Sequence, residues 1–196
     1  MNKPSNYDDI ALHRDPIKLG GHIAVIKKVE ETKSKAGKDQ VVIYIDFDIQ
    51  DEQADYFKKI YQADTRQEKK WPNDGTLYIT NNDQAIFDRN VKAFNTAYED
   101  SNGVQTIWGS SWAAQFKGKK IGVVYGEEES VWRDELRTNR KIRFFCDCHK
   151  ALDQDVPKKK LYKGIVGTQT TEDPRADQNA FMDFTDLPED DGLPFN

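Results

Sequence analysis

Apolar and polar residues alternate along residues 20–49, and this alternation is the clearest structural signal in the chain. The first half divides into one set with Ile23, Val25, Lys27 and Val29 and a second set with His22, Ala24, Ile26 and Lys28. The second half divides into one set with Val41, Ile43, Ile45, Phe47 and Ile49 and a second set with Val42, Tyr44, Asp46 and Asp48. A period of two is typical of β-strands, and the Lys-rich stretch 33–38 with its Gly reads as a turn. The pattern predicts a long hairpin with one buried face.

The period of the apolar and polar pattern changes after this hairpin. Residues 51–74 lose the alternation and predict a charged, partly helical excursion, and residues 75–80 predict a third strand. Residues 81–100 predict a helix, with Asn81 or Asn82 as its N-cap. The apolar side chains at helical spacing are Ile86, Phe87, Val91, Phe94 and Tyr98. A short second helix is expected around residues 110–116, with Trp108 and Trp112 in the core.

Two further strands are predicted at residues 119–129 and within residues 131–151. In the last strand the alternation places Ile142, Phe144 and Cys146 inward and Lys141, Arg143 and Phe145 outward. The order is three strands, a helix and two strands, which is the layout of an OB-fold, a five-stranded Greek-key β-barrel. We therefore expect a mainly β protein with an irregular arm at residues 1–16, an OB-fold-like domain at residues 17–165 and a disordered acidic tail at residues 166–196.

Charge is distributed unevenly between these parts. The whole chain of 196 residues has a net charge of −5, but residues 171–196 contain eight acids and one base. The tail segment therefore carries −7 and residues 1–170 carry +2, so an acidic whole-chain charge does not argue against nucleic acid as a partner of the body. The first 16 residues lack the apolar stretch of a signal peptide, and no run of about 18 apolar residues predicts a membrane span. We expect a cytoplasmic protein without a membrane partner.

Enzyme motifs are absent from the sequence. It has no Gly-rich phosphate loop, no zinc-protease helix motif and no nucleophile elbow, so we expect no catalytic residues and no cofactor. Cys146, Cys148 and His149 lack a second ligand pair, which favours ordinary strand cysteines over a metal site. The acidic residues 126–130 favour a solvated β-turn over a carboxylate metal cup. A metal-dependent nuclease stays open as one alternative.

The body does offer cations interleaved with aromatic rings. Cations follow the phosphates of a single strand, while flat rings stack on unpaired bases of any identity. The predicted DNA-binding residues are Lys33, Lys35, Lys38, Tyr44, Lys69, Lys70, Trp71, Trp132, Arg133, Arg137, Arg140, Lys141, Arg143 and Phe145. Tyr44 is placed on the outer face of the second strand, which in OB-folds is a binding face.

The last residues of the chain resemble the C-terminal tip of bacterial single-stranded DNA-binding proteins. That tip combines a cluster of acids with an apolar residue, Pro and Phe, and the resemblance implies a docking peptide for replication and repair proteins. The matching residues here are Glu189, Asp190, Asp191, Leu193, Pro194 and Phe195. Acids are attracted to a basic rim while the ring fills an apolar pocket, and Pro lowers the cost of ordering the peptide. Asn196 follows the Phe that normally ends the family's chains and displaces the terminal carboxylate.

The body is similar to a different family, the phage-encoded proteins of replication and recombination modules. The similarity runs from about Gly20 to Leu161 and is carried by the first hairpin, the strand at residues 117–129 and the basic stretch 135–145. It implies an OB-like barrel that binds single-stranded DNA without catalysis. A DNA mimic that occupies a basic site on another protein is the alternative from a different class, and the oligomeric state, monomer or homo-oligomer, stays open.

Overall fold

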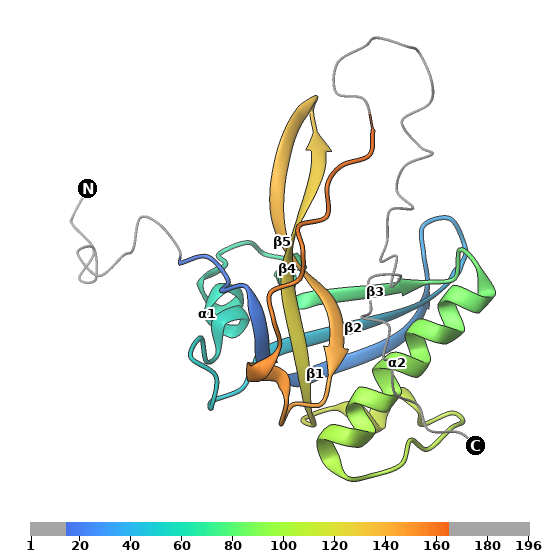
Figure 1. Ribbon diagram of the computed structural model, residues 1–196. Helices are drawn as coiled ribbons and strands as arrows, with labels where there is room; N and C mark the ends of the chain where they lie inside the picture. Colours follow the sequence, from blue (N-terminus) through green and yellow to red (C-terminus); the bar gives the residue numbers. More distant parts are fainter. Residues whose placement is uncertain (1–14, 165–196) are drawn as a thin grey trace, which may run out of the picture.

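In the computed structural model of the chain, residues 15–164 are described. They form a mainly β structure around one five-stranded antiparallel sheet with the order β3-β2-β1-β4-β5 (Figure 1). The strands are β1 (Gly20–Lys33), β2 (Asp39–Phe47), β3 (Thr76–Thr80), β4 (Lys120–Trp132) and β5 (Glu135–Cys146). The predicted mainly β class and the five strands are confirmed.

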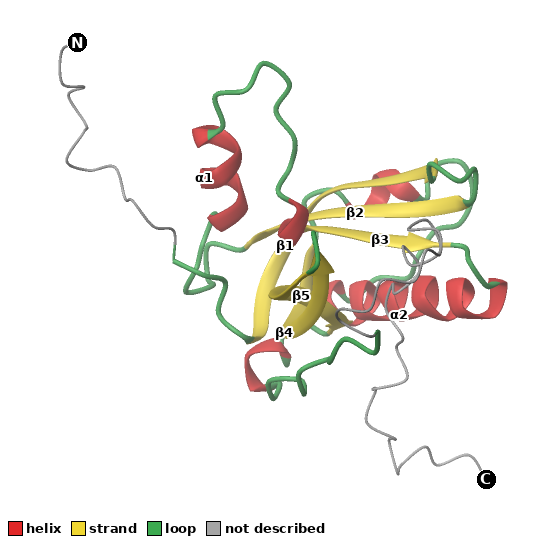
Figure 2. Cartoon of the chain, turned by 90° about the horizontal axis from the view of Figure 1, so that it is seen from above, coloured by secondary structure: helices red, strands yellow, loops and turns green. Residues whose placement is uncertain are grey.

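Two α-helices, α1 (Tyr56–Ala63) and α2 (Gln84–Asn102), stand well apart on the sheet (Figure 2). Short 3₁₀ helices occupy η2 (Asn73–Gly75), η3 (Ala113–Phe116) and η4 (Ala151–Asp153). The predicted N-cap of the long helix is wrong by one residue, because the carboxylate of Asp83 accepts the hydrogen bond from the backbone N–H of Ile86 at 3.0 Å. Gly103 ends this helix in the left-handed conformation, at φ 63°, which favours Gly.

The core lies between the sheet and the two helices. At one end, the His22 ring stacks on Phe47 at 4.3 Å, and Phe47 also contacts Phe57 of α1. At the other end, Phe94 of α2 packs against Phe116 and Phe145 at ring distances of 4.8 and 5.3 Å. Burial of these large rings is the main apolar contribution to the stability of the fold.

Two β-bulges change which side chains face this core. In β1, Ile26 pairs with Ile45 and Lys28 pairs with Tyr44, so Lys27 is an extra residue. Val29 therefore lies buried on the same face as Ile26, and the single uninterrupted alternation predicted for this strand is wrong. At the end of β2, the predicted inward position of Ile49 is also wrong, since this side chain lies beyond the strand and is 85% exposed.

The second bulge lies in β5. Phe144 pairs with Val124 and Ile142 pairs with Tyr125, which leaves Arg143 as the extra residue. The bulge places Phe145, like Ile142, on the core side, where Phe145 is only 7% exposed. The predicted outward position of Phe145 is therefore wrong, and so are the predicted inward positions of Phe144 and Cys146, which lie on the opposite face and are half-buried.

Beyond the core, β4 and β5 continue as a long hairpin that projects away from the rest of the sheet (Figure 1). We call the part of this hairpin from residue 127 to residue 141 the arm. Residues 126–130, predicted as a solvated turn, are instead strand residues of β4, so that prediction is wrong. Beside them runs the segment around Lys160, whose backbone N–H and C=O bond to Glu127 and Glu129 at 2.9 Å. This pairing covers an edge of β4 that β1 no longer reaches.

Within the described part of the chain, no helix has the length and apolar character needed to cross a membrane. The irregular N-terminal segment predicted at residues 1–16 lies outside the described residues except for residues 15 and 16. The predicted acidic tail and its tip, residues 166–196, lie wholly outside them.

Candidate nucleic-acid interface

The predicted DNA-binding residues fall into three groups in the structure. The first is the β1–β2 turn, with Lys33, Lys35 and Lys38. The second is the outer face of β1, β2 and β3 together with the loop after α1, with Tyr44, Lys69, Lys70 and Trp71. The third is the β4–β5 hairpin, with Trp132, Arg133, Arg137, Arg140, Lys141 and Arg143.

The β1–β2 turn is a tight loop held by its own backbone. The N–H of Gly37 donates to the carbonyl of Ser34 at 2.8 Å, and Gly37 has a φ of 76°. Lys33 pairs with Asp39 at 2.8 Å, and Lys38 donates to the amide oxygen of Asn82 at 2.7 Å. Lys35 is exposed at the tip. The turn therefore presents three ammonium groups within residues 33–38, and neighbouring side chains orient two of them.

Tyr44 lies on the outer face of the sheet, as predicted, and is half-buried. Its hydroxyl donates to Glu30 of β1 at 2.9 Å, and burial followed by this hydrogen bond raises the pKa of Tyr44 to about 12. The group is therefore a neutral phenol at physiological pH. One edge of the ring is fixed by Glu30, so the ring is held in one orientation beside solvent.

Tyr78 of β3 is a surface ring that the predicted site residues omit. Tyr44 pairs with Thr76 and Val42 pairs with Tyr78, so the two tyrosines are diagonal neighbours on one face of the sheet. Tyr78 is 37% exposed. Its position between the buried residues Leu77 and Ile79 is the signal that could have identified it as outward-facing.

Trp71 lies in the loop between α1 and η2 and is only half-exposed. Its indole N–H donates to the backbone carbonyl of Ile45 at 2.9 Å, and its ring lies 5.5 Å from Tyr61 of α1. Lys69 lies over the Tyr61 ring at 5.9 Å. Trp71 is therefore partly a structural residue, and only one side of its ring is available to a ligand.

A cavity of about 460 Å³ lies beside this ring. Its lining includes Trp71, Lys70, Arg66 and Asp64. Arg66 pairs with Asp64 at 2.6 Å, and its hydrogen bonds lower the pKa of Asp64 to about 2. A concave site with one ring face and two cations suits a base and its phosphate.

The tip of the arm carries the most exposed predicted ring. Trp132 is 56% exposed, and the Arg133 guanidinium lies 5.7 Å from its centroid. Arg133 and Asp134 form the two-residue turn with φ values of 51° and 62°, both in the left-handed region that a type I′ hairpin requires. Neither residue is Gly, so this turn carries backbone strain while it presents a cation next to a ring. Arg137 pairs with exposed Glu135 at 2.9 Å.

The cationic side chains nearer the core form hydrogen bonds and ion pairs within the protein. Arg140 donates to the backbone carbonyl of Ile17, and Lys141 pairs with Asp74 at 3.2 Å. Arg143 donates to the carbonyl of Glu127 at 3.3 Å, and all three cations are half-buried. They can still contribute positive potential, but their side chains also hold the arm to the body.

Two aromatic predictions are corrected by the structure. Phe145 is buried against Phe94, so its ring is not available for stacking on a base. Trp108, predicted to be core, is 68% exposed, whereas Trp112 is buried as predicted.

The acids of β4 do not form a metal cup. Glu129 pairs with Lys159 at 2.7 Å and Glu128 pairs with Lys160 at 3.4 Å. Neighbouring strand residues point to opposite faces, so Glu128 and Glu129 cannot converge on one ion. The segment that covers β4 thus also neutralises its acids.

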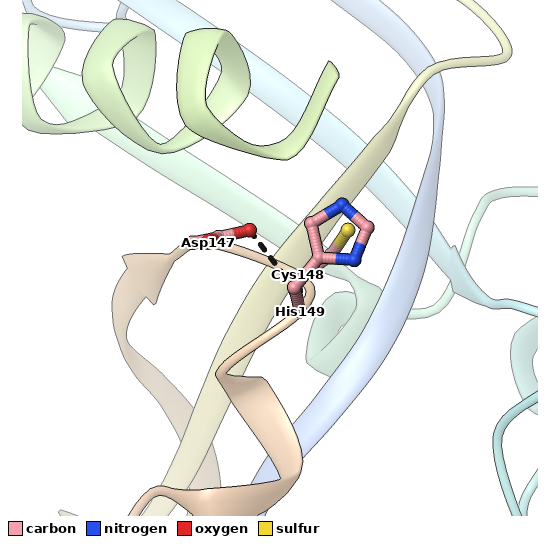
Figure 3. Close-up of side chains that lie close together, drawn as sticks. All are labelled: Asp147, Cys148 and His149. Carbon is pink, nitrogen blue, oxygen red and sulfur yellow. Dashed lines mark hydrogen bonds between the residues drawn. The ribbon is translucent and has the colours of Figure 1, made fainter. Parts of the chain in front are cut away.

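Asp147, Cys148 and His149 are the one group of three potential metal ligands within residues 15–164, and their ligand atoms lie within 4.8 Å of one another (Figure 3). Their contacts are those of a tight turn. The Asp147 carboxylate accepts from the N–H of His149 at 3.0 Å, the dashed line in Figure 3, and the buried Cys148 thiol donates to the carbonyl of Ser101 at 3.7 Å. Burial raises the pKa of the neighbouring Cys146 to about 12, which disfavours the thiolate that a metal would need.

Scans of the chain against protein-family models and against curated proteins found no match.

Proposed function

We propose that this protein binds single-stranded DNA without sequence preference and coats exposed strands during replication or recombination in the cytoplasm. The observation that carries the proposal is the arm tip, where exposed Trp132 lies beside Arg133 on a strained turn. Such a pair combines a stacking surface for bases with a cation for phosphates. No catalytic group is required for this function.

The arrangement of the strands supports the same proposal. In the sheet, β4 lies next to β1, followed by β2 and β3, which is the Greek-key order, and α2 lies between β3 and β4 in the chain. We interpret the domain as an OB-fold. OB-folds bind oligonucleotides with the face of strands 2 and 3 and with the loops that join strands 1–2 and 4–5. These three places coincide with Tyr44 and Tyr78, the Lys-rich turn and the arm tip.

We further propose that the tip residues from Glu189 to Phe195 dock replication or recombination proteins rather than DNA. The support comes from their chemistry, since three acids repel phosphates while Leu193 and Phe195 offer apolar anchors. The similarity of the body to phage-encoded proteins and of the tip to bacterial ones implies the same division of roles.

A titration with oligo(dT), followed by tryptophan fluorescence with and without Mg²⁺, tests the DNA proposal. Binding should not need Mg²⁺, should leave the oligonucleotide intact, and should weaken as salt rises because counterions are released. Absence of binding would favour a DNA mimic, and Mg²⁺-dependent shortening of the oligonucleotide would favour a nuclease.

Deletion of residues 189–196 tests the tail proposal. The truncated protein should bind oligo(dT) at least as well as the full chain, most clearly at low salt, because three acids have been removed. It should no longer retain replication proteins in a pull-down, and Phe195→Ala should reproduce that loss. Truncation that weakens DNA binding but keeps the partners would overturn this assignment.

A further inference from the structure

An open groove of about 710 Å³ runs along α2, and none of its lining residues belongs to the candidate DNA interface. One wall is the helix face with Phe87, Val91 and Asn95, and the other is formed by Val41 of β2 and by Trp108 and Trp112. Figure 1 shows the loop after α2 folding back beneath the helix. Val41 faces the core side of β2 whereas Tyr44 faces the outer side, so the groove and the Tyr44–Tyr78 face lie on opposite faces of the sheet.

Two residues that line the groove carry buried polar atoms without hydrogen-bond partners in the described part of the chain. Asn95 is only 5% exposed, and neither its amide oxygen nor its amide nitrogen accepts or donates a hydrogen bond. Trp112 is 4% exposed, and its indole N–H is also unpaired. A buried polar group without a hydrogen-bond partner destabilises the folded protein, so two of them on one groove point to a ligand that pairs with them.

The exposed ring at the mouth of the groove is held in place. Trp108 is 68% exposed and stacks on Trp112, with ring centroids 6.1 Å apart and planes 12° from parallel. The side chain of Gln115 accepts from the N–H and donates to the carbonyl of Ile107, and Glu99 accepts from the N–H of Thr106. Hydrogen bonds to the two residues before Trp108 thus order the loop before any ligand arrives, which lowers the cost of binding.

The chemistry of the groove selects the ligand. An Asn side chain can pair with both the N–H and the C=O of a peptide backbone, and these groups are free in an extended peptide but already bonded in a helix. The helix face from Phe87 to Glu99 spans about 18 Å, which accommodates about five extended residues. The charged groups around it are Glu31, Asp88, Glu99 and Lys92, an excess of acids that repels both DNA phosphates and this chain's own acidic tip.

We propose that this groove is a docking site for an extended segment of a partner protein, with apolar side chains flanked by Lys or Arg. The apolar side chains pack between Trp108 and the α2 face, the backbone pairs with Asn95 and the Trp112 indole, and the cations lie against the acidic rim. The site is independent of DNA binding and of the C-terminal tip.

The test uses the full chain and blocked synthetic peptides. The probe peptide Lys-Leu-Phe-Leu-Lys is compared with Glu-Leu-Phe-Leu-Glu, with the octapeptide of residues 189–196 and with oligo(dT). Binding is followed by the NMR signals of the four indole N–H groups. The basic peptide should shift the Trp112 signal and bind at least about tenfold more tightly than either acidic peptide at low salt.

Two matched pairs of variants separate docking from folding. Asn95→Leu should lower the affinity for the basic peptide about tenfold. Asn90→Leu changes another buried Asn of α2 that lies outside the groove, and it should leave this affinity unchanged. Trp108→Ala should weaken it by a similar factor, whereas Trp132→Ala should leave it unchanged. Preference for the octapeptide, a Trp112 shift caused by oligo(dT), self-association that competes with the peptide, or no binding of the basic peptide would each overturn the proposal.

Discussion

The β4–β5 hairpin has two halves with opposite properties. In the half next to the core, residues 121–126 of β4 are all buried, and Ile142 and Phe145 of β5 lie on the same side of the sheet as Tyr125 and Val123. In the arm, residues 127–131 are half-buried and Trp132 is exposed. The hydrogen-bonded ladder continues through both halves, so backbone pairing alone does not distinguish them.

The difference follows from what packs against each half. β1 pairs with β4 only as far as Tyr125, and α2 covers the same end. Past that point β4 has only β5 and the segment around Lys160 beside it. We infer that the inner half determines stability and the arm determines binding, and the following experiments test that separation.

The largest effect is expected from Phe145→Ala. The buried ring contacts Phe94, so its removal should lower the free energy of unfolding by about 3–5 kcal/mol through reduced burial and a cavity. Urea denaturation measures this decrease, and Thr138→Ala on the exposed arm is the control, with an expected change within about 0.5 kcal/mol. A stable Phe145→Ala protein with weakened oligo(dT) binding would reverse the roles assigned to the two halves.

The next effect concerns the buried pair of His22, on β1, and Asp51. His22 and Asp51 are 3.1 Å apart and almost fully buried, and the other ring nitrogen of His22 faces the carbonyl of Lys18 at 2.9 Å. Asp51→Asn should lower the free energy of unfolding by about 1–3 kcal/mol at neutral pH, because His22 and the backbone N–H groups of Ile23 and Gln53 lose the buried carboxylate that accepts their hydrogen bonds. Thermal unfolding measures it, and Asp39→Asn, an exposed ion-pair acid, is the control.

The same pair predicts a pH dependence. Burial opposes ionisation of Asp51, but hydrogen bonds from His22 and from the backbone of Gln53 and Ile23 outweigh it and lower the pKa of Asp51. The folded protein therefore binds a proton less readily than the unfolded chain, whose Asp pKa is about 3.9. The stabilisation is present above about pH 4 and is lost as pH falls below it. In chemical denaturation between pH 5 and 2.5, the stability difference between wild type and Asp51→Asn should shrink, and a constant difference would exclude Asp51 as its source.

Trp132→Ala should separate binding from stability. If the exposed ring stacks on a base, oligo(dT) binding should weaken by about 1–3 kcal/mol, while the free energy of unfolding changes by less than about 0.5 kcal/mol. Trp71→Ala is the informative contrast, because that ring also bonds to Ile45 and should lose stability as well as affinity. Unchanged affinity in Trp132→Ala would remove the arm tip from the interface.

The smallest effect is expected in the salt dependence of binding. Replacing Arg133 and Arg137 by Gln should flatten the slope of log affinity against log salt by about 0.7 for each phosphate that is no longer neutralised. Lys141 and Arg143 bond to the protein itself, so replacing both should flatten it less. Fluorescence titrations at several NaCl concentrations compare the two double variants. Equal slopes would show that the arm tip contacts no more phosphates than Lys141 and Arg143 do.

Much of the fold was readable from the order of residues. The strands and the long helix follow local patterns, which are a period of two over residues 39–47 and 76–80 and helical spacing from Ile86 to Tyr98. Each pattern arises because one face of one element is buried. The strand order around the inserted helix was also consistent with the sheet that forms. These features depend on neighbours in the chain, so the sequence alone determines them.

The tertiary structure decides which side chains lie at the surface. The extra residues Lys27 and Arg143 in two bulges shift the faces of β1 and β5, and a bulge depends on the pairing of a strand with its partner rather than on its own alternation. In the same way, Phe145 is buried against Phe94, which belongs to a distant helix. Trp108 stays exposed and stacks on Trp112, whose buried ring packs against Phe116. Close packing lets one ring occupy one position, and that competition between distant segments has no trace in the local sequence.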